Sequence, residues 1–219
     1  MLRHAPDLVC LQEVDHPRLL SRALAAAGYS GRHLHKPDSP CLYLPHNNGP
    51  DGCALFYNAA KFELISWATR VLRVWDVPSN QVGAAADTRQ SLASIFANVV
   101  MHLKFYAKVI LGAILRSRET GQELVVATTH LKAKFGELRA SFRLEQSKDI
   151  LGWLEAIRGG RPVILTGDLN GEPSEEFYTA LTRSRDLALE PSYGPDTEYT
   201  TWKIRDTGEQ KHVLGGRVA

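Results

Sequence analysis

The chain has 219 residues, which is enough for one large domain with a substantial core. Its 44% hydrophobic and 23% charged residues are typical of a folded protein and exclude an intrinsically disordered one. The net charge of +2 is too small to attract a nucleic acid by bulk electrostatics alone.

The longest apolar stretch, residues 91–115, is interrupted by a histidine and two lysines, so the sequence predicts no membrane-spanning segment. The three cysteines are odd in number and lack the spacing of metal ligands. Cys10 and Cys53 lie in apolar runs and are predicted to be core residues, which fits a reducing compartment. No apolar segment of a signal peptide is visible, and we expect a cytoplasmic location.

The first half of the chain alternates short apolar runs with turn residues. Helical spacing of Leu19, Leu20 and Leu24 predicts a helix at about residues 17–27. Four prolines and an Asn-Asn-Gly sequence predict a long irregular loop over residues 36–52. Apolar runs of strand length predict strands over residues 8–12, 29–34, 53–57, 62–65 and 69–75.

The second half begins with a predicted β-hairpin, residues 109–115 and 123–130, joined by a turn that contains Gly121. A long helix is predicted over residues 136–158, ended by two glycines. Its core face is predicted from the helical spacing of Leu138, Phe142, Ile150, Leu151, Leu154 and Ile157. A strand over residues 163–166 and a helix from Ser174 follow. Strands interleaved with helices favour a single α/β domain over residues 1–219.

The strand over residues 163–166 ends in Gly-Asp168-Leu-Asn170. A carboxylate and a carboxamide two residues apart at a strand end can point into one cleft. There Asp168 could take a proton from an attacking water, and Asn170 could orient that water or bind the anion under attack. The alternative is a simple turn, since these residue types favour turns.

Other strand ends carry similar groups. Glu13 closes the first strand and suits Mg²⁺, although a lone glutamate there is more often a surface residue. His130 could bond a phosphate or brace the site, and Lys132 could bind phosphate as a point charge; the alternative for His130 is a satisfied core residue. Asn80 by itself indicates no more than a turn.

Basic residues also gather at Lys132, Lys134, Arg139 and Arg143. This cluster would suit a phosphate-bearing ligand, but it is equally typical of a solvated helix face.

Taken together, Leu-Gln-Glu13-Val, Thr-His130-Leu-Lys and Gly-Asp168-Leu-Asn170 have the order and spacing of the endonuclease/exonuclease/phosphatase superfamily, which the chain resembles. Longer blocks carry the resemblance across most of the chain: residues 6–16, 46–56, 80–82, 129–133, 167–173 and 199–205. The resemblance implies a four-layer αββα sandwich with a Mg²⁺ site at one end.

In that family Glu13 would be the metal ligand, and Asp168 and Asn170 would position the water and bind substrate. The resemblance places a second group of residues around the ligand: Lys36, Pro37, Asn80, His130, Leu131, Lys132, Ala133 and Lys134. The implied substrate is NADP⁺ or NADPH, which would lose its 2′-phosphate in a monomeric enzyme without a membrane partner. The alternative is RNA, shortened by a poly(A)-specific 3′ exoribonuclease. Relatives also occur in mitochondria.

The sequence departs from the family in three places. No counterpart of an upstream strand with an active-site Asn precedes the Glu13 motif, and Gly215 stands where the family has an Asp, with no Ser-Asp-His segment after it. We therefore expect the chain as written to have negligible phosphatase activity, which leaves a catalytically inactive form as a further alternative. Residues 83–108 are a predicted insertion. It could pack as an amphipathic helix through Ile95, Val99, Leu103 and Tyr106.

Overall fold

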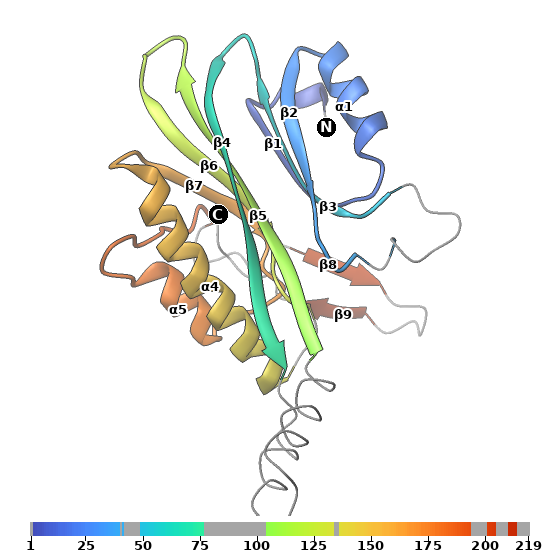
Figure 1. Cartoon of the computed structure of the whole chain (residues 1–219), viewed down its shortest axis with the longest axis vertical. Helices are drawn as coiled ribbons and strands as arrows, with labels where there is room; N and C mark the ends of the chain where they lie inside the picture. Colours follow the sequence, from blue (N-terminus) through green and yellow to red (C-terminus); the bar gives the residue numbers. More distant parts are fainter. Residues whose placement is uncertain are drawn as a thin grey trace, which may run out of the picture.

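The computed structural model describes residues 2–39, 41, 49–76, 104–133, 136–193, 201–204 and 210–213. Two β-sheets face each other, and helices cover their outer faces (Figure 1). The layers are a helix, a three-stranded sheet, a four-stranded sheet and a pair of helices. The predicted four-layer αββα sandwich is therefore confirmed.

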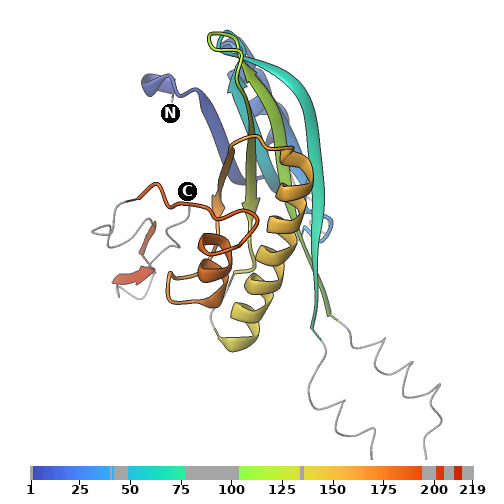
Figure 2. The same ribbon diagram turned by 90° about the vertical axis from the view of Figure 1, so that its left-hand side faces the viewer.

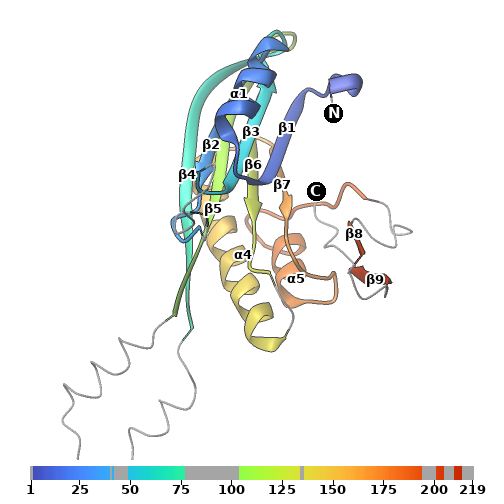
Figure 3. The same ribbon diagram turned by 90° about the vertical axis from the view of Figure 1, so that its right-hand side faces the viewer.

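The smaller sheet is antiparallel and has the order β1-β3-β2. Its elements are β1 (Leu8–Val14), α1 (Pro17–Ala26), β2 (Tyr29–His35) and β3 (Gly52–Asn58), after a short 3₁₀ helix, η1 (Leu2–His4). α1 lies over the outer face of this sheet (Figure 3). Leu24 is its fully buried residue and packs against Val9 and Ala54 of the strands below.

The larger sheet has the order β4-β5-β6-β7, with a parallel β6–β7 pair. Its elements are β4 (Phe62–Asp76), β5 (Lys104–Ser117), β6 (Glu123–His130), α4 (Glu137–Arg158), β7 (Val163–Asp168) and α5 (Glu176–Thr182). α4 connects the parallel strands and packs beside α5 on the outer face (Figure 2). A separate two-stranded ribbon is formed by β8 (Thr201–Ile204) and β9 (Gln210–Val213).

The alternation of side chains along β5 creates two different cores. Ile110 points toward the α4 side and packs with Ile150, whereas Leu111 points between the two sheets and packs with Leu55. Since both faces of the strand are covered, it reads as an almost continuous apolar run. None of the helices within the described ranges is long and apolar enough to cross a membrane.

The predicted strands at 62–65 and 69–75 are one strand, β4, and the sequence prediction of a break was wrong. A register shift between Leu64 and Ser66 lets the strand continue past the irregular point. Trp67 then packs against Tyr57 of the facing sheet, with ring centroids 6.4 Å apart, and the backbone keeps its pairing with β5.

The helix suggested for residues 83–108 is also wrong where it can be checked. Residues 104–108, including Tyr106, belong to β5 and pair with the end of β4. Ile95, Val99 and Leu103 lie outside the described residues.

The boundaries of the helices differ little from the predictions. α4 ends at Gly159 in a left-handed conformation, as expected, and α5 begins at Glu176 rather than at Ser174. Leu138 is 47% exposed and does not join the core, because it lies in the first turn of α4, beyond the packed part of the sheet. Buried positions of α4 include instead the polar residues Arg143 and Gln146.

Candidate active site

Three candidate residues lie at the ends of strands in the two facing sheets: Glu13 in β1, His130 in β6 and Asp168 in β7. His130 and Asp168 are direct partners in the parallel β6–β7 register, and His130 Nε2 lies 3.9 Å from Asp168 Oδ2. Glu13 and His130 line the same small cavity. The structure therefore brings these three residues, which are far apart in the sequence, to one end of the sandwich.

A hydrogen bond between the sheets holds β1 in place next to Glu13. The Gln12 side-chain amide, Nε2, donates to Thr128 Oγ1 of β6 over 2.8 Å. Thr128 is fully buried, so this bond is shielded from water. The polar residue before Glu13 thus links the two sheets.

The backbone is strained at two of the candidate residues. Glu13 has φ 55° and Asn170 has φ 52°, and the described residues contain one other non-glycine residue with positive φ, Ala5. At Glu13 the strain coincides with a register shift in β1 between Leu11 and Val14. Left-handed conformations of this kind cost about 1–3 kcal/mol and concentrate at functional sites. The two strained residues are a predicted metal ligand and a predicted substrate-binding amide.

Asn170 is also a turn residue in the ordinary sense. Its backbone N–H donates to Asp168 Oδ1 over 3.0 Å, and its side-chain Nδ2 donates to the carbonyl of Leu131 over 3.2 Å. The Leu131 N–H in turn donates to the carbonyl of Asp168 over 2.9 Å. The turn interpretation of the Asp168–Asn170 sequence is therefore confirmed, and the turn fixes the two side chains whose catalytic role stays a prediction.

Gly167 is needed for the close approach of β7 to β6. A Cβ at this position would lie 2.2 Å from the carbonyl oxygen of Thr129, and φ is 150°. No side chain fits there, so glycine sets the distance between the strands that carry His130 and Asp168.

Lys36 directly follows the end of β2. Its Nζ forms an ion pair with Asp51 Oδ2 over 2.6 Å. The buried Ser39 hydroxyl also donates to the Asp51 carboxylate, and the Asp51 N–H donates back to Ser39 Oγ over 3.0 Å. Burial by itself would raise the pKa of Asp51, but the bonds from Lys36 and Ser39 outweigh it and lower that pKa. Asp51 thus stays charged and holds Lys36 at the cavity.

Lys108 of β5 is a site residue that the sequence analysis missed. It lines the cavity together with Glu13, Lys36, Asp51 and His130. Burial, and next the repulsion from Lys36, lower the pKa of Lys108. The sequence around Lys108, at the end of the predicted insertion, did not indicate a site residue. Lys108 reaches the cavity only because β5 pairs with its neighbouring strands.

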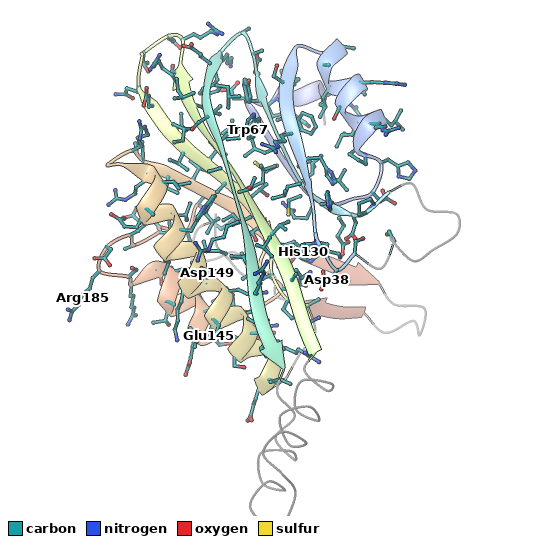
Figure 4. The ribbon with its side chains drawn as sticks, in the orientation of Figure 1. Asp38, Trp67, His130, Glu145, Asp149 and Arg185 are labelled. Carbon is teal, nitrogen blue, oxygen red and sulfur yellow. The ribbon has the colours of Figure 1, made fainter. Side chains whose placement is uncertain are left out.

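His130 is neutral at neutral pH. Burial, followed by repulsion from Lys108, lowers its pKa well below the usual range, and the carboxylates of Asp168 and Glu13 oppose this only in part. A neutral imidazole can donate or accept a hydrogen bond but adds no positive charge. Figure 4 shows His130 near Asp38, at the end of the sheets that holds the cavity. The cations at the cavity are therefore lysines.

Side chains of α4 hold the backbone of the segment that follows β6. Arg143 is 1% exposed; its Nη1 donates to the Lys132 carbonyl over 3.0 Å, and its Nε and Nη2 donate to the Glu175 carboxylate, each over 2.8 Å. Gln146 Oε1 accepts the Lys132 N–H over 3.1 Å. The suggestion that Arg143 belongs to a phosphate-binding cluster was wrong, because this side chain is buried and supports the backbone of Lys132.

The remaining predicted ligand residues occupy different environments. Leu131 has a fully buried side chain, so a ligand cannot reach it. Pro37 is exposed and Ala133 is half-buried next to the site. Asn80 and Lys134 lie outside the described residues.

The donor set around Glu13 fits a hard divalent cation. Glu13 is exposed, and no basic side chain in the described ranges forms an ion pair with it. The same ranges contain no group of three or more His, Cys, Asp or Glu residues that could enclose an ion. Mg²⁺ suits such a site, since it keeps several waters and takes one or two protein carboxylates together with substrate phosphates.

Comparison with known proteins identifies the family. A model of the Endonuclease/Exonuclease/phosphatase family matches residues 1–217. The chain belongs to this family. Its members are hydrolases that generally use a divalent metal.

Relatives at higher identity are nocturnins. The chain is 38% identical to nocturnin of Drosophila melanogaster over 239 residues, covering 98% of this chain and 33% of that protein. It is 41% identical to nocturnin of Xenopus laevis over 224 residues, covering 98% of this chain and 50% of that protein. The chain thus spans half or less of the length of these relatives.

A solved structure supports the same assignment. The human nocturnin catalytic domain with a bound sulfate anion superposes with a TM-score of 0.69 at 36% identity, covering 88% of this chain and 61% of that one. The chain is therefore a nocturnin-like member of the Endonuclease/Exonuclease/phosphatase family.

Proposed function

We propose that this protein is a Mg²⁺-dependent phosphohydrolase that removes the 2′-phosphate of NADP⁺ or NADPH. The proposal rests on one observation: oxygen donors and cations lie together at one end of the sandwich. Oxygen donors from Glu13 and Asp168 lie beside the lysines of the cavity, Lys36 and Lys108, around the neutral His130. Hydrolysis of a phosphate ester requires both, because charge on the transferring group must be neutralised while a water is positioned.

Each residue would have a separate role. Glu13 would hold Mg²⁺, which would supply charge neutralisation at the phosphate. Asp168 would take a proton from the attacking water, and its carboxylate is held for this by the Asn170 N–H. His130 would donate a hydrogen bond to a phosphate oxygen, since it is neutral and lies on the same cavity as Glu13.

The choice of NADP(H) rests on the similarity to nocturnins and on the kind of site. The cavity by Glu13 measures about 10 Å³, room for about one water, so its lining rather than its size supports a phosphate: Lys36, Lys108 and His130 surround it. A bound sulfate in the human nocturnin catalytic domain supports an anion site in a relative of this fold. NADP⁺ carries a 2′-phosphate and NAD⁺ does not. The cations that would bind this phosphate, and so distinguish the two ligands, are Lys36, Lys108 and Lys132.

Phosphate release from NADPH, measured beside the shortening of an oligo(A) substrate with the same protein and Mg²⁺, tests the proposal. The 219 residues themselves are expected to release negligible phosphate, so the comparison is made with a chain that also carries the family's active-site Asn and Ser-Asp-His segment. With that chain, phosphate release without shortening is the expected result, and shortening without phosphate release would favour the exoribonuclease. Binding of NADP⁺ against NAD⁺ by calorimetry gives a second readout that does not depend on turnover. Equal affinity for the two ligands would contradict the proposal.

Glu13→Gln is the matched test of the metal. The amide has nearly the same shape but no charge, so we expect Mg²⁺ affinity to fall at least about tenfold. Glu119→Gln, an exposed change in the β5–β6 turn, should leave Mg²⁺ binding unaltered.

A further inference from the structure

A second concave site lies outside the Glu13 cavity, between α1 and the end of β2. It is an open depression of about 700 Å³. It is lined by His16, Pro17, Arg18, Leu19, Arg22, His33, His35, Gly49 and Pro50. A depression of this size is in the range of small-ligand sites. None of the roles proposed above uses it.

Regular structure brings its cationic groups together. Arg18 and Arg22 are four residues apart in α1 and so share a face of that helix. His33 and His35 are two residues apart in β2 and so share a face of that strand. α1 packs on β2 (Figure 3), and the four side chains line the same depression.

The two arginines lack counter-charges. Within the part of the chain that the structure describes, neither Arg18 nor Arg22 forms an ion pair or hydrogen bond through its guanidinium. Other arginines of the same ranges do: Arg116 pairs with Glu123 over 2.6 Å, and Arg161 with the same carboxylate over 2.7 Å. Like charges at this spacing destabilise a helix by about 0.2–0.5 kcal/mol, so the pair is an unfavourable arrangement without a ligand.

The neighbouring carboxylates are already engaged. Asp15 contacts His16 Nδ1 over 2.8 Å, and Asp51 is held by Lys36. His33 Nε2 lies 3.1 Å from the carbonyl of Val14, which can only accept, so this nitrogen carries the hydrogen and the ring orientation is fixed. The depression therefore presents arginines and oriented imidazoles with no carboxylate among its lining residues.

We propose that this depression is a binding site for a phosphate group of a phosphorylated ligand, separate from the Glu13 cavity. Two guanidiniums with planar donor arrays match the oxygens of phosphate. The imidazoles of His16 and His35 can add donors, whereas the donor of His33 is already bound to the Val14 carbonyl. His35 and Pro50, which line the depression, are followed in the chain by Lys36 and Asp51, which line the Glu13 cavity. The phosphate can thus belong to a molecule that also enters the Glu13 cavity or to a second molecule.

Binding of inorganic pyrophosphate to the full chain tests the site independently of any reaction. In an NMR titration of ¹⁵N-labelled protein, we expect the backbone amide signals of residues 16–22 and 33–35 to shift with pyrophosphate. The double variant Arg18→Gln/Arg22→Gln should weaken the binding reported by these signals about tenfold or more, because charge-assisted bonds are lost. Glutamine keeps the helix propensity of arginine, so α1 should persist.

The control is Arg3→Gln/Arg185→Gln, which removes the same charge from two exposed arginines away from the depression. This pair should leave the affinity within about twofold. Equal affinity of the Arg18/Arg22 variant and the parent protein, or an equal loss in both pairs, would overturn the proposal.

A competition experiment identifies the source of the phosphate. If one molecule spans both sites, NADP⁺ should displace pyrophosphate from the depression, and the Arg18/Arg22 variant should bind NADP⁺ more weakly. If a separate molecule occupies the depression, NADP⁺ and adenosine 2′-phosphate should bind unchanged while pyrophosphate is present. Either result supports a phosphate site here and says what fills it.

Discussion

The two sides of the candidate site are built in different ways. On the β6–β7 side, backbone groups are held by a dense set of short hydrogen bonds, with Arg143 buried beneath them. On the β1–β3 side, the site consists of charged side chains: Glu13 on a strained backbone and Lys36 held by Asp51. The first side provides rigid geometry and the second provides charge. Substitutions on the first side should therefore change folding, and those on the second should change binding.

Arg143→Met removes the buried guanidinium that supports the β6–β7 side. It leaves the Glu175 carboxylate and the Lys132 carbonyl without their buried donor, so the free energy of unfolding should fall by about 3–5 kcal/mol. Urea denaturation followed by circular dichroism measures this. The control is Arg158→Met, whose pair with Glu155 lies at the surface and should contribute little to the free energy of unfolding. Similar small losses in both variants would mean that the buried pair does not hold this side together.

Lys132→Ala removes the ammonium group of Lys132 and keeps the backbone that the β6–β7 side holds in place. Its backbone bonds to Gln146 and Arg143 remain, so folding should be unchanged. Affinity for NADP⁺ should fall about tenfold more than affinity for NAD⁺, because the lost ammonium would contact the 2′-phosphate. Calorimetry with both ligands measures the difference. Lys148→Ala, at an exposed pair with Glu145, is the control, and an equal effect on both ligands would remove Lys132 from the phosphate site.

Glu13→Gly tests whether the charged side stores strain. Glycine adopts φ 55° without the steric cost of a side chain, so the free energy of unfolding should rise by about 1 kcal/mol while Mg²⁺ binding is lost. Glu13→Gln keeps the strain and should lose binding without gaining stability. If Glu13→Gly instead lowers the free energy of unfolding, the backbone conformation of Glu13 does not store strain.

The smallest effect is the pH dependence due to Asp51. Its pKa is lowered in the folded protein, so the folded state binds the proton less readily than the unfolded chain does. The stabilisation is present above the unfolded pKa of about 3.9 and is lost as the pH falls through the lower folded pKa. Urea denaturation of the parent and of Asp51→Asn between about pH 2 and pH 6 should show a stability difference that shrinks toward the acid end. A constant difference would assign the effect to packing.

The sequence was most informative where local patterns decide the structure. The apolar run of β1, the helical spacing of α1 and the glycines after α4 gave elements close to those observed. Motifs at strand ends indicated Glu13, His130 and Asp168 before any contact between them was known. Predictions failed where pairing with a distant strand overrode the local signal, as in the single long strand β4 and in residues 104–108 of β5.

The sequence by itself therefore determined an α/β domain and the family, because periodic apolar residues and strand-end motifs are local properties of the chain. The αββα sandwich followed from the resemblance to that family. Tertiary structure alone decided that Arg143 is a buried support, that Lys108 joins the cavity and that Arg18 and Arg22 face His33 and His35. Each of these facts depends on which strands pair and on which faces of helices and strands meet. A charged residue has the same local pattern whether it is solvated, buried in an ion pair or facing a ligand, and only the packing of distant elements distinguishes these environments.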